Sequence, residues 1–490
     1  MIDYNKFEKA QAEPEASSMI ETFRAIGYSI EAAVADIIDN SISAFAKNIW
    51  VSFNWNGSET SISIKDDGHG MNNNELIQAM RPGSKNPLDD RSIKDLGRFG
   101  LGLKTASFSQ CRQLSVISKK ENEDPVFWTW DLDFVKQSGK WQLLKYLPDS
   151  SYEKEIIAQE SGTIVIWNQI DRYLKNTSKE DRIAQDKFQI LMEQVRKHLA
   201  MVFHRFIESG KIKIWCWNRI IEPWNPFQEK EPATQVFPEE LLCEGQISVK
   251  GFVLPHKSKQ KEQNFKLMEG IKGWNDQQGF YVYRNERMLL SGDWLGMFRK
   301  EEHYKLARIQ IDVPNSLDTD WQIDIKKSIA RPPLFIRDQL KAYAQTVRAQ
   351  AVEVYRHKGK SVRQLPGQRF IPLWVEHKRG DKWFYKINRN HPLIEKTKNE
   401  AKADPDKAIE MMLRYIEETI PTKSIYIKEA EEPEAQGKPF EGVDTEPILN
   451  AIKQMFENLK KSGKTNEDAK SIILNIEPFN HFPHLLEFIE

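Results

Sequence analysis

The chain has few cysteines, no long apolar run and no excess of charge of either sign. Its three cysteines lie far apart in 490 residues without CxxC spacing, which argues against a zinc site or a disulfide framework and fits a reducing compartment. No stretch approaches the ~18 consecutive apolar residues of a membrane span, and residues 1–18 lack the apolar core of a signal peptide. We therefore expect a cytoplasmic protein that does not bind membranes.

The charges balance, with 71 Lys and Arg against 71 Asp and Glu, so the protein is not coated in basic charge. A local basic face remains possible, because residues 326–369 hold eleven Lys or Arg against two acids. Such a run either contacts nucleic acid phosphates or forms a solvated helix face. No base-reading motif is visible, so any DNA contact is expected to be independent of sequence.

The first part of the chain, residues 18–175, has the pattern of an α+β domain. Apolar spacing predicts a helix over 18–46, and two alternating runs flank Asn56-Gly57, a strong hairpin signal. Helices near 74–80 and 103–110 follow, with strands at 113–118, 126–131, 141–146 and 163–167. This order predicts an α/β sandwich with helices on one face of a mixed sheet.

Two further parts complete the chain. Residues 176–360 predict a second α/β domain, with helices at 181–208 and 335–357 around strands at 211–217, 246–254, 278–290 and 306–313. Residues 361–490 predict a small helical region of unknown role, with a hairpin at Trp374 to Tyr385.

The first chemical motif is ADIIDNSISA, on the first predicted helix. Asp36 and Asn40 lie four residues apart and share one helix face. A carboxylate there can orient or deprotonate a water, and an amide oxygen one turn away suits Mg²⁺. The alternative is an ordinary solvated helix face.

The second motif is DDGHGM, directly after a predicted strand. A buried carboxylate at Asp66 can accept a hydrogen bond from the amine of adenine, and Gly68 and Gly70, followed by Met71, let the backbone approach the base. The alternative is a simple turn, since Asp and Gly favour turns.

The third motif is GRFGLGLKTAS over 97–107, which precedes a predicted helix. Backbone N–H groups at a helix start, reached through a glycine loop, make an anion site, and Lys104 adds a positive charge. The pattern is neither a Rossmann fingerprint nor a Walker A loop. A fourth element, Thr163, opens the strand TIVIW, where Thr is also a common strand residue.

Together, ADIIDN, DDGHGM, GRFGLGLKTAS and SGTIVIW resemble the N box, G1 box, G2 box and terminal Thr motif of the GHKL (Bergerat-fold) ATPases. The GLKTAS form is most similar to the MutL and MORC branch. The likeness extends more loosely over 170–350, which resembles the S5-like transducer domain of gyrase and MutL.

The resemblance implies ATP and Mg²⁺ as ligands, with Asp66 on adenine, Asn40 on Mg²⁺ and a loop that covers the phosphates as a mobile lid. The implied contacts in and beside that loop are Ser84, Lys85, Gly97, Gly100, Leu101, Gly102, Leu103 and Lys104. Two positions depart from the family pattern. Asp36 stands where a Glu base is usual, and its side chain places the carboxylate about 1.5 Å closer to the helix than Glu would. A displacement near 1 Å can lower the reaction rate about a hundredfold. Ser43 stands where a second acid is common.

Transducer domains of this superfamily also send a lysine to the γ-phosphate. Lys326 and Lys327, in SLDTDWQIDIKKSIARPP, are the candidates, and the alternative is two solvated lysines. The nearby YRNER stretch over 283–287 resembles a family pattern, but no chemistry is assigned to it.

The expected function is a slow Mg²⁺-dependent ATPase that acts as an ATP-gated homodimeric clamp linked to DNA. The resemblance further implies a restriction or anti-phage system with nuclease or helicase-like partner proteins. The alternatives are a nucleotide-sensing or chaperone-like module with little hydrolysis, and a MutL-type DNA-repair factor. A histidine kinase is disfavoured, since no phosphoacceptor His precedes the first helix.

Overall fold

The computed structural model describes residues 3–10, 12–84, 101–174, 177–259, 261–318, 320–324, 330–356, 371, 373–379, 382–392, 394–395, 405–418, 420 and 445–489. The chain forms two compact units, Met1–Gly359 and Lys360–Glu490. In the described ranges, no helix is both long enough and apolar enough to cross a bilayer.

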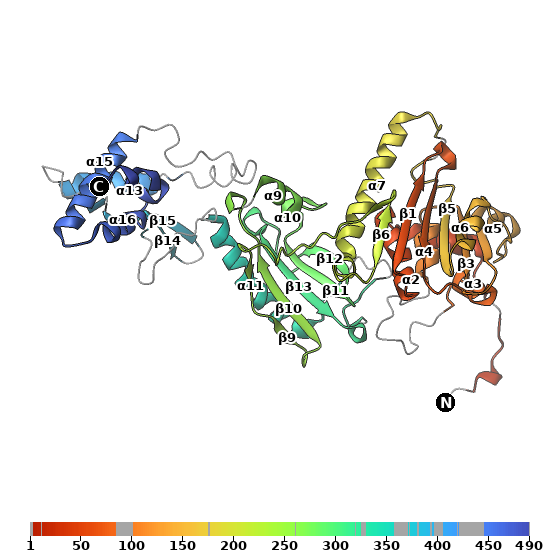
Figure 1. The fold of residues 1–490 in the computed structure, drawn as a ribbon. Coiled ribbons are helices and arrows are strands. Elements are labelled where there is room, and N and C mark those ends of the chain that lie inside the picture. The colour runs from red at the N-terminus through yellow and green to blue at the C-terminus, as the bar shows by residue number, and fades with distance from the viewer. Residues whose placement is uncertain are drawn as a thin grey trace. The chain divides into compact units, whose positions relative to one another are not determined.

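A mixed seven-stranded sheet forms the first part of unit 1, in the order β4-β3-β5-β2-β1-β6-β7 (Figure 1). Its strands are β1 (Asn48–Asn54), β2 (Ser61–Asp66), β3 (Gln113–Lys119), β4 (Val126–Asp131), β5 (Gly162–Asn168), β6 (Lys213–Cys216) and β7 (Arg219–Ile220). Neighbouring strands are antiparallel except β1 and β6. The predicted hairpin is confirmed, because β1 and β2 pair across the Asn56-Gly57 turn, where Gly57 has φ of 58°.

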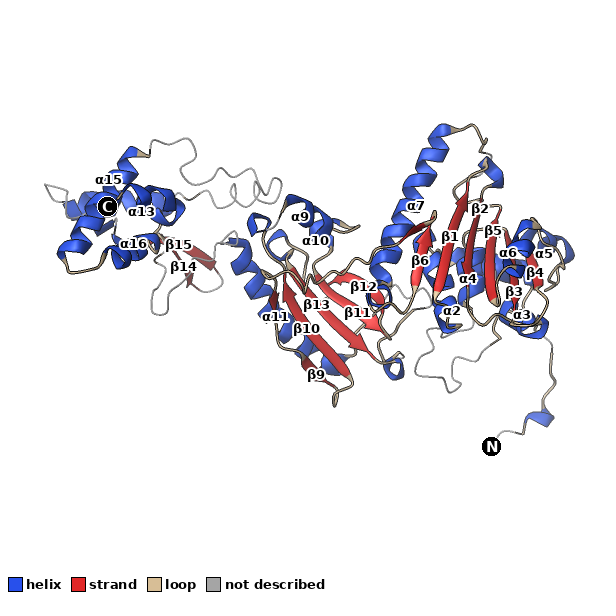
Figure 2. Cartoon of the chain, in the orientation of Figure 1, coloured by secondary structure: helices blue, strands red, loops and turns tan. Residues whose placement is uncertain are grey.

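Helices cover this sheet and build its main core (Figure 2). They are α1 (Ala16–Ala25), α2 (Ile30–Ser43), α3 (Asn73–Met80), α4 (Gly102–Phe108), α5 (Leu132–Ser138), α7 (Arg182–Val202) and α8 (His204–Glu208). One short helix, α6 (Ser151–Ile157), packs on the other face, where Ile156 meets Ile164 and Ile166 of β5. The prediction of a mixed sheet layered with helices is confirmed.

Two local predictions are wrong. The single helix expected over 18–46 is two helices, because Gly27 adopts φ of 77° after α1, a left-handed conformation that ends a helix. The strand expected over 141–146 does not form. Leu144 exchanges two backbone hydrogen bonds with Thr129, at 3.0 and 2.9 Å, as a single bridge on the edge strand β4.

A second mixed sheet follows in unit 1, in the order β12-β11-β13-β10-β8, with β9 also on β10. Its strands are β8 (Gln235–Val236), β9 (Glu240–Leu242), β10 (Ile247–Val253), β11 (Gly279–Arg284), β12 (Arg287–Asp293) and β13 (Ala307–Val313). The long helix α11 (Leu334–Arg356) packs on it so closely that a Cβ at Gly251 would meet Val347 Cγ2 at 2.5 Å. The short helices of this part are α9 (Glu262–Met268), α10 (Gly273–Asp276), η3 (Lys257–Lys259), η4 (Glu302–Tyr304) and η5 (Asn315–Leu317).

Unit 2 contains the predicted hairpin, formed by β14 (Trp374–Arg379) and β15 (Lys382–Ile387). Its helices are α13 (Pro405–Glu418), α15 (Glu446–Lys461), α16 (Asn466–Leu474), η6 (Phe479–His481) and η7 (Pro483–Phe488). Ile452 and Phe456 of α15 pack against Ile473 of α16 in a small apolar core. Two further short helices in the described ranges, η1 (Tyr4–Lys6) and η2 (Gly57–Glu59), belong to unit 1.

Candidate nucleotide-binding site

Asp66 is the best-defined polar group among the predicted site residues. It ends β2, and its side chain is held from two sides: the Ser41 hydroxyl donates to Oδ2 at 2.7 Å, and the Gly68 N–H donates to Oδ1 at 3.0 Å. Burial raises the pKa of Asp66, and these two hydrogen bonds oppose that effect. The result is a carboxylate fixed at the end of a strand in a largely dry environment.

The neighbouring Asp67 has a different role. Its Oδ1 accepts the backbone N–H groups of Lys47 and Asn48 at 2.7 and 2.8 Å, and its Oδ2 accepts the Asn48 side-chain amide at 2.7 Å. Asp67 therefore closes the start of β1 onto the end of β2. Of the two acids in DDGHGM, the structure uses this one to hold the sheet together.

Thr163 lies directly beside Asp66 on the adjacent strand β5, as its partner in register. Its hydroxyl is 2.8 Å from the Ser118 hydroxyl, which also accepts the Met71 N–H at 2.9 Å. The structure thus brings three predicted residues, Asp66, Met71 and Thr163, to one edge of the sheet. Ser118 was missed, because a Ser in the middle of an alternating strand carries no distinguishing signal.

The glycines of this edge are required by backbone packing. A Cβ on Gly70, which has φ of +66°, would lie 1.8 Å from the Lys119 carbonyl oxygen. A Cβ on Gly68 would lie 2.8 Å from the Ala44 carbonyl oxygen. These contacts give both glycines a structural reason that does not involve a ligand.

Helix α2 carries the other half of the predicted site. Asp36 is buried, and the Tyr28 hydroxyl donates to its Oδ2 at 3.0 Å. Asn40, one turn further along, is exposed, as an amide that contacts a ligand should be. Because Ser41 of the same helix holds Asp66, α2 physically links the candidate base to the candidate adenine contact.

The start of α4 faces this helix, since a Cβ built on Gly102 would lie 3.9 Å from Asp36 Oδ2. Leu101 and Leu103 pack on the main core. Lys104 is buried, with 2% of its surface exposed, and its Nζ donates to the Ala79 carbonyl at 2.9 Å. The charge of Lys104 interacts here with the C-terminal end of α3, and its contact with phosphates stays a prediction.

Several predicted residues lie outside the described part of the chain. These are Lys85, Gly97, Gly100, Lys326 and Lys327. Ser84 is described and exposed. The second-domain segment that leads to the two lysines is described up to Asp324. Burial raises the pKa of Tyr28, and the negative charges of Asp36 and Asp324 add to that effect.

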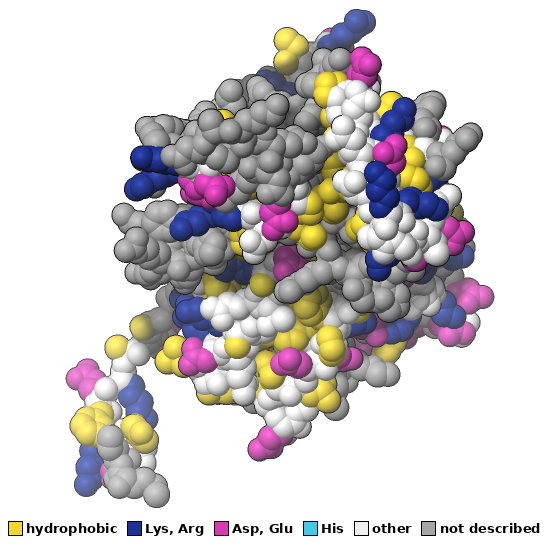
Figure 3. Space-filling model, turned by 90° about the vertical axis from the view of Figure 1, so that its left-hand side faces the viewer, with side chains coloured by type: hydrophobic (Ala, Val, Ile, Leu, Met, Phe, Trp, Pro, Cys, Tyr) yellow, Lys and Arg dark blue, Asp and Glu magenta, His cyan; other side chains and the backbone are white. Residues whose placement is uncertain are grey.

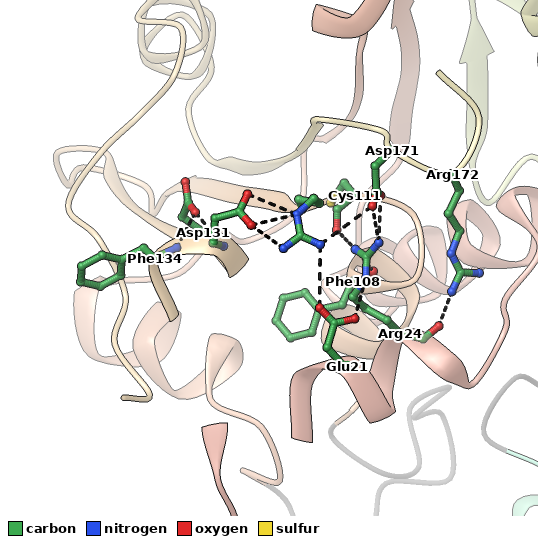
Figure 4. A network of polar contacts seen from close by, with 10 residues as sticks. Glu21, Arg24, Phe108, Cys111, Asp131, Phe134, Asp171 and Arg172 are labelled. Atoms are coloured by element: carbon green, nitrogen blue, oxygen red, sulfur yellow. Dashed lines mark hydrogen bonds and ion pairs between the residues drawn. The ribbon is translucent and has the colours of Figure 1, made fainter. Parts of the chain in front are cut away.

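The far end of α4 is held by a buried arginine (Figure 4). Arg24 of α1 donates through Nη1 to the carbonyls of Phe108 and Cys111, at 2.9 and 2.8 Å, and through Nη2 to both oxygens of Asp171, at 2.9 and 2.6 Å. Arg172 donates in turn to the Arg24 carbonyl. This network caps the α4 carbonyls and so fixes the helix whose start faces Asp36.

The candidate metal chemistry rests on oxygen ligands. Within the described ranges, no three His, Cys, Asp or Glu side chains form a cluster that could hold a metal. Mg²⁺ commonly binds through one or two protein oxygens together with phosphates and water. The exposed amide of Asn40 fits that mode.

The arrangement agrees with comparisons to known proteins. Residues 28–163 match the family described as "Histidine kinase-, DNA gyrase B-, and HSP90-like ATPase". The DNA mismatch repair protein MutL of Dictyoglomus turgidum is 37% identical over 113 residues, which are 22% of this chain and 19% of that protein. The ATPase morc-1 of Caenorhabditis elegans is 28% identical over 119 residues, 24% of this chain and 13% of that protein.

The chaperone protein HtpG of Rickettsia canadensis is 27% identical over 188 residues, 36% of this chain and 27% of that protein. The matches thus span 19% of the MutL relative, 13% of morc-1 and 27% of HtpG. The matched family covers the positions of Asp36, Asp66 and Thr163. Residues 28–163 of this chain are therefore similar to the ATPase domain of that superfamily.

Proposed function

We propose that this protein binds ATP with Mg²⁺ and hydrolyses it slowly, as a DNA-linked clamp that closes by dimerisation. The observation that carries the proposal is the pairing of two buried carboxylates through one helix. Asp36 lies on α2, and Ser41 of the same helix holds Asp66. In this proposal Asp36 acts on a water and Asp66 on adenine, and the proposal is supported by the match of residues 28–163 to a family of ATPases.

Each residue has a distinct role in this proposal. Asp66 accepts a hydrogen bond from the exocyclic amine of adenine, and Thr163 and Ser118 keep its strand end in place. Asp36 orients and deprotonates the attacking water. Asn40 supplies an oxygen to Mg²⁺, which neutralises phosphate charge when bound. Lys326 or Lys327 meets the γ-phosphate.

The clamp and its partners are proposed from the similarity to MutL. MutL is named as a DNA mismatch repair protein, which supports DNA as a partner. The basic stretch 326–369 contributes less than its count suggests, because Arg348 stacks on Phe298 and Tyr304, with its guanidinium 3.9 and 3.8 Å from the ring centres. On the face drawn in Figure 3, Lys and Arg intermix with Asp and Glu. DNA contact is therefore proposed as weak and sequence-independent, and the defence role and nuclease or helicase-like partners remain parts of the same proposal.

A second candidate is a nucleotide sensor that scarcely hydrolyses ATP. It is favoured by the engagement of Asp36, whose Oδ2 accepts from Tyr28 and whose Oδ1 lies 3.6 Å from Arg287 Nη2. A carboxylate held by both groups is less available to a water than a free one.

The test is Mg²⁺-dependent ATP hydrolysis and ATP binding by calorimetry for the wild type, Asp36→Asn and Asp66→Asn. Asp36→Asn should stop turnover and keep binding. Asp66→Asn should weaken binding about 10- to 100-fold, because a hydrogen bond to a charged group contributes about 1.5–3 kcal/mol. Glu155→Gln is the control, since Glu155 forms only a surface ion pair with Lys65 at 3.2 Å.

Two further readouts separate the candidates. Light scattering with a non-hydrolysable ATP analogue should show dimers, and duplex DNA should raise the turnover rate of a clamp. Binding without any turnover, with or without DNA, would make the sensor the better description. No ATP binding by the wild type would refute both.

A further inference from the structure

The turn between β11 and β12 has a buried arginine at each end. Arg284 and Arg287 are partners in register, and Asn285 and Glu286 between them both have positive φ, 48° and 68°. Their exposed fractions are only 3% and 4%. A buried guanidinium is costly unless it is paired, so each arginine needs a carboxylate partner.

The two arginines pair in different directions. Arg284 Nε donates to Asp318 Oδ1 at 2.8 Å, within the second sheet's own domain. Asp318 is buried as well, so this ion pair ties the chain after β13 to the β11–β12 turn.

Arg287 pairs with α2, 248 residues away in sequence. Its Nε donates to both oxygens of Asp39, at 3.0 and 2.9 Å, and its Nη2 lies 3.6 Å from Asp36 Oδ1. Its Nη1 donates to the Met288 carbonyl at 2.9 Å, which fixes the guanidinium plane relative to β12. The arginine is thereby oriented by its own strand and directed at the acidic side of the helix.

These contacts bear directly on the orientation of Asp36. Asp39 lies three residues after Asp36, so the two side chains share a helix face and one guanidinium reaches both. Tyr28 takes Oδ2 and Arg287 faces Oδ1. The orientation of the candidate base is therefore set by one group from its own domain and one from the second sheet.

We propose that Arg287 is a positioning residue for Asp36. It acts through Asp39, and the β11–β12 turn thereby holds the base helix α2. This inference rests on the proposed ATPase function. In its simplest form, loss of Arg287 leaves nucleotide binding intact, because the Asp66 carboxylate is held by Ser41 and Gly68 and not by Arg287, but it misplaces the base.

The experiment compares Arg287→Gln and Asp39→Asn with the wild type in the full chain, measuring kcat, KM and the Kd of ATP. Each variant should lower kcat by about tenfold or more, since a displacement near 1 Å can cost about a hundredfold, while Kd changes by less than about threefold. Glu286→Gln is the matched control on the same turn, because Glu286 only pairs with the exposed Lys211 at 2.6 Å, and it should retain wild-type kcat.

The double variant Arg287→Gln/Asp39→Asn supplies the decisive measurement, because it removes both members of the Arg287–Asp39 pair while Asp36 keeps its hydrogen bond from Tyr28, and so it remains readable if a single variant fails to fold. Its kcat should be no lower than that of the less active single variant, since both changes break the same Arg287–Asp39 contact. A double variant with kcat within twofold of the wild type would overturn the inference and leave the ATPase proposal standing. A wild type without turnover would overturn both.

Discussion

Gly70 offers a direct test of whether a glycine of the nucleotide motif is required by packing or by ligand approach. Gly70→Ala places a Cβ where the Lys119 carbonyl oxygen would be 1.8 Å away, in a backbone with φ of +66°. Gly83 is a matched control, because its φ is +68° and a Cβ there meets nothing within 4 Å. The two substitutions share the backbone strain and differ in the clash.

The magnitudes follow from these two terms. A left-handed conformation costs a non-glycine residue about 1–2 kcal/mol, and this is the whole expected loss at Gly83. Forcing an extra methyl group into a packed region adds about 1–3 kcal/mol, so Gly70→Ala should lose about 2–5 kcal/mol. The clash is with backbone of β3, which cannot move without disturbing the Ser118 contacts to Met71 and Thr163.

Urea denaturation of the full chain, followed by tryptophan fluorescence, measures both losses, and calorimetry measures ATP binding by each variant. Equal destabilisation by the two alanines would refute the packing argument. So would a Gly70→Ala protein of normal stability that has lost ATP affinity, because that result assigns the open side of Gly70 to the ligand.

Three further predictions concern buried charges. Burial raises the folded pKa of Asp66 above its unfolded value, so wild-type stability should fall as pH rises through that interval. Thermal melts of Asp66→Asn should lack this fall and should gain most over the wild type near neutral pH. Burial, with a smaller effect of nearby cations, lowers the pKa of His198 to about 3, so stability present above the unfolded value of about 6.5 should be lost as pH falls towards 3. His198→Gln should melt with a shallower dependence on pH over that window, and an unchanged slope would contradict the assignment. Arg24→Gln leaves Asp171 with the longer 3.9 Å contact to Arg112 and leaves the Phe108 and Cys111 carbonyls without their donor, so it should cost about 2–4 kcal/mol in urea titrations, whereas the more exposed Arg112→Gln should cost about 1 kcal/mol or less. Similar losses for the two arginines would show that the Arg24 network contributes little.

Much of the fold could be predicted because its signals are local. Alternation around Asn56-Gly57 predicted the β1–β2 hairpin, and the glycine-rich start of GLGLKTAS predicted α4. The errors are also local in origin. Gly27 lies inside a long apolar repeat that predicts one continuous helix, although its positive φ ends α1. Residues 141–146 have strand-like alternation, but among them only Leu144 pairs with the sheet edge.

The candidate site divides in the same way. The order of motifs places Asp36, Asp66 and Thr163 in a GHKL domain, and the matched family covers those positions. Sequence spacing also predicted that Asn40 shares a helix with Asp36, because four residues make about one helical turn. It could not separate the roles of Asp66 and Asp67, which are adjacent and chemically identical.

By itself, the sequence determined the order of elements, the domain type and the residues able to carry the chemistry, because periodicity and glycine placement act over a few residues. Only the tertiary structure decided which partners those residues meet. Arg287 reaches Asp39 across 248 positions, and Lys104 turns to the Ala79 carbonyl. The physical reason is that burial forces each charge to find a partner, and that partner is chosen by the folded arrangement of distant strands and helices.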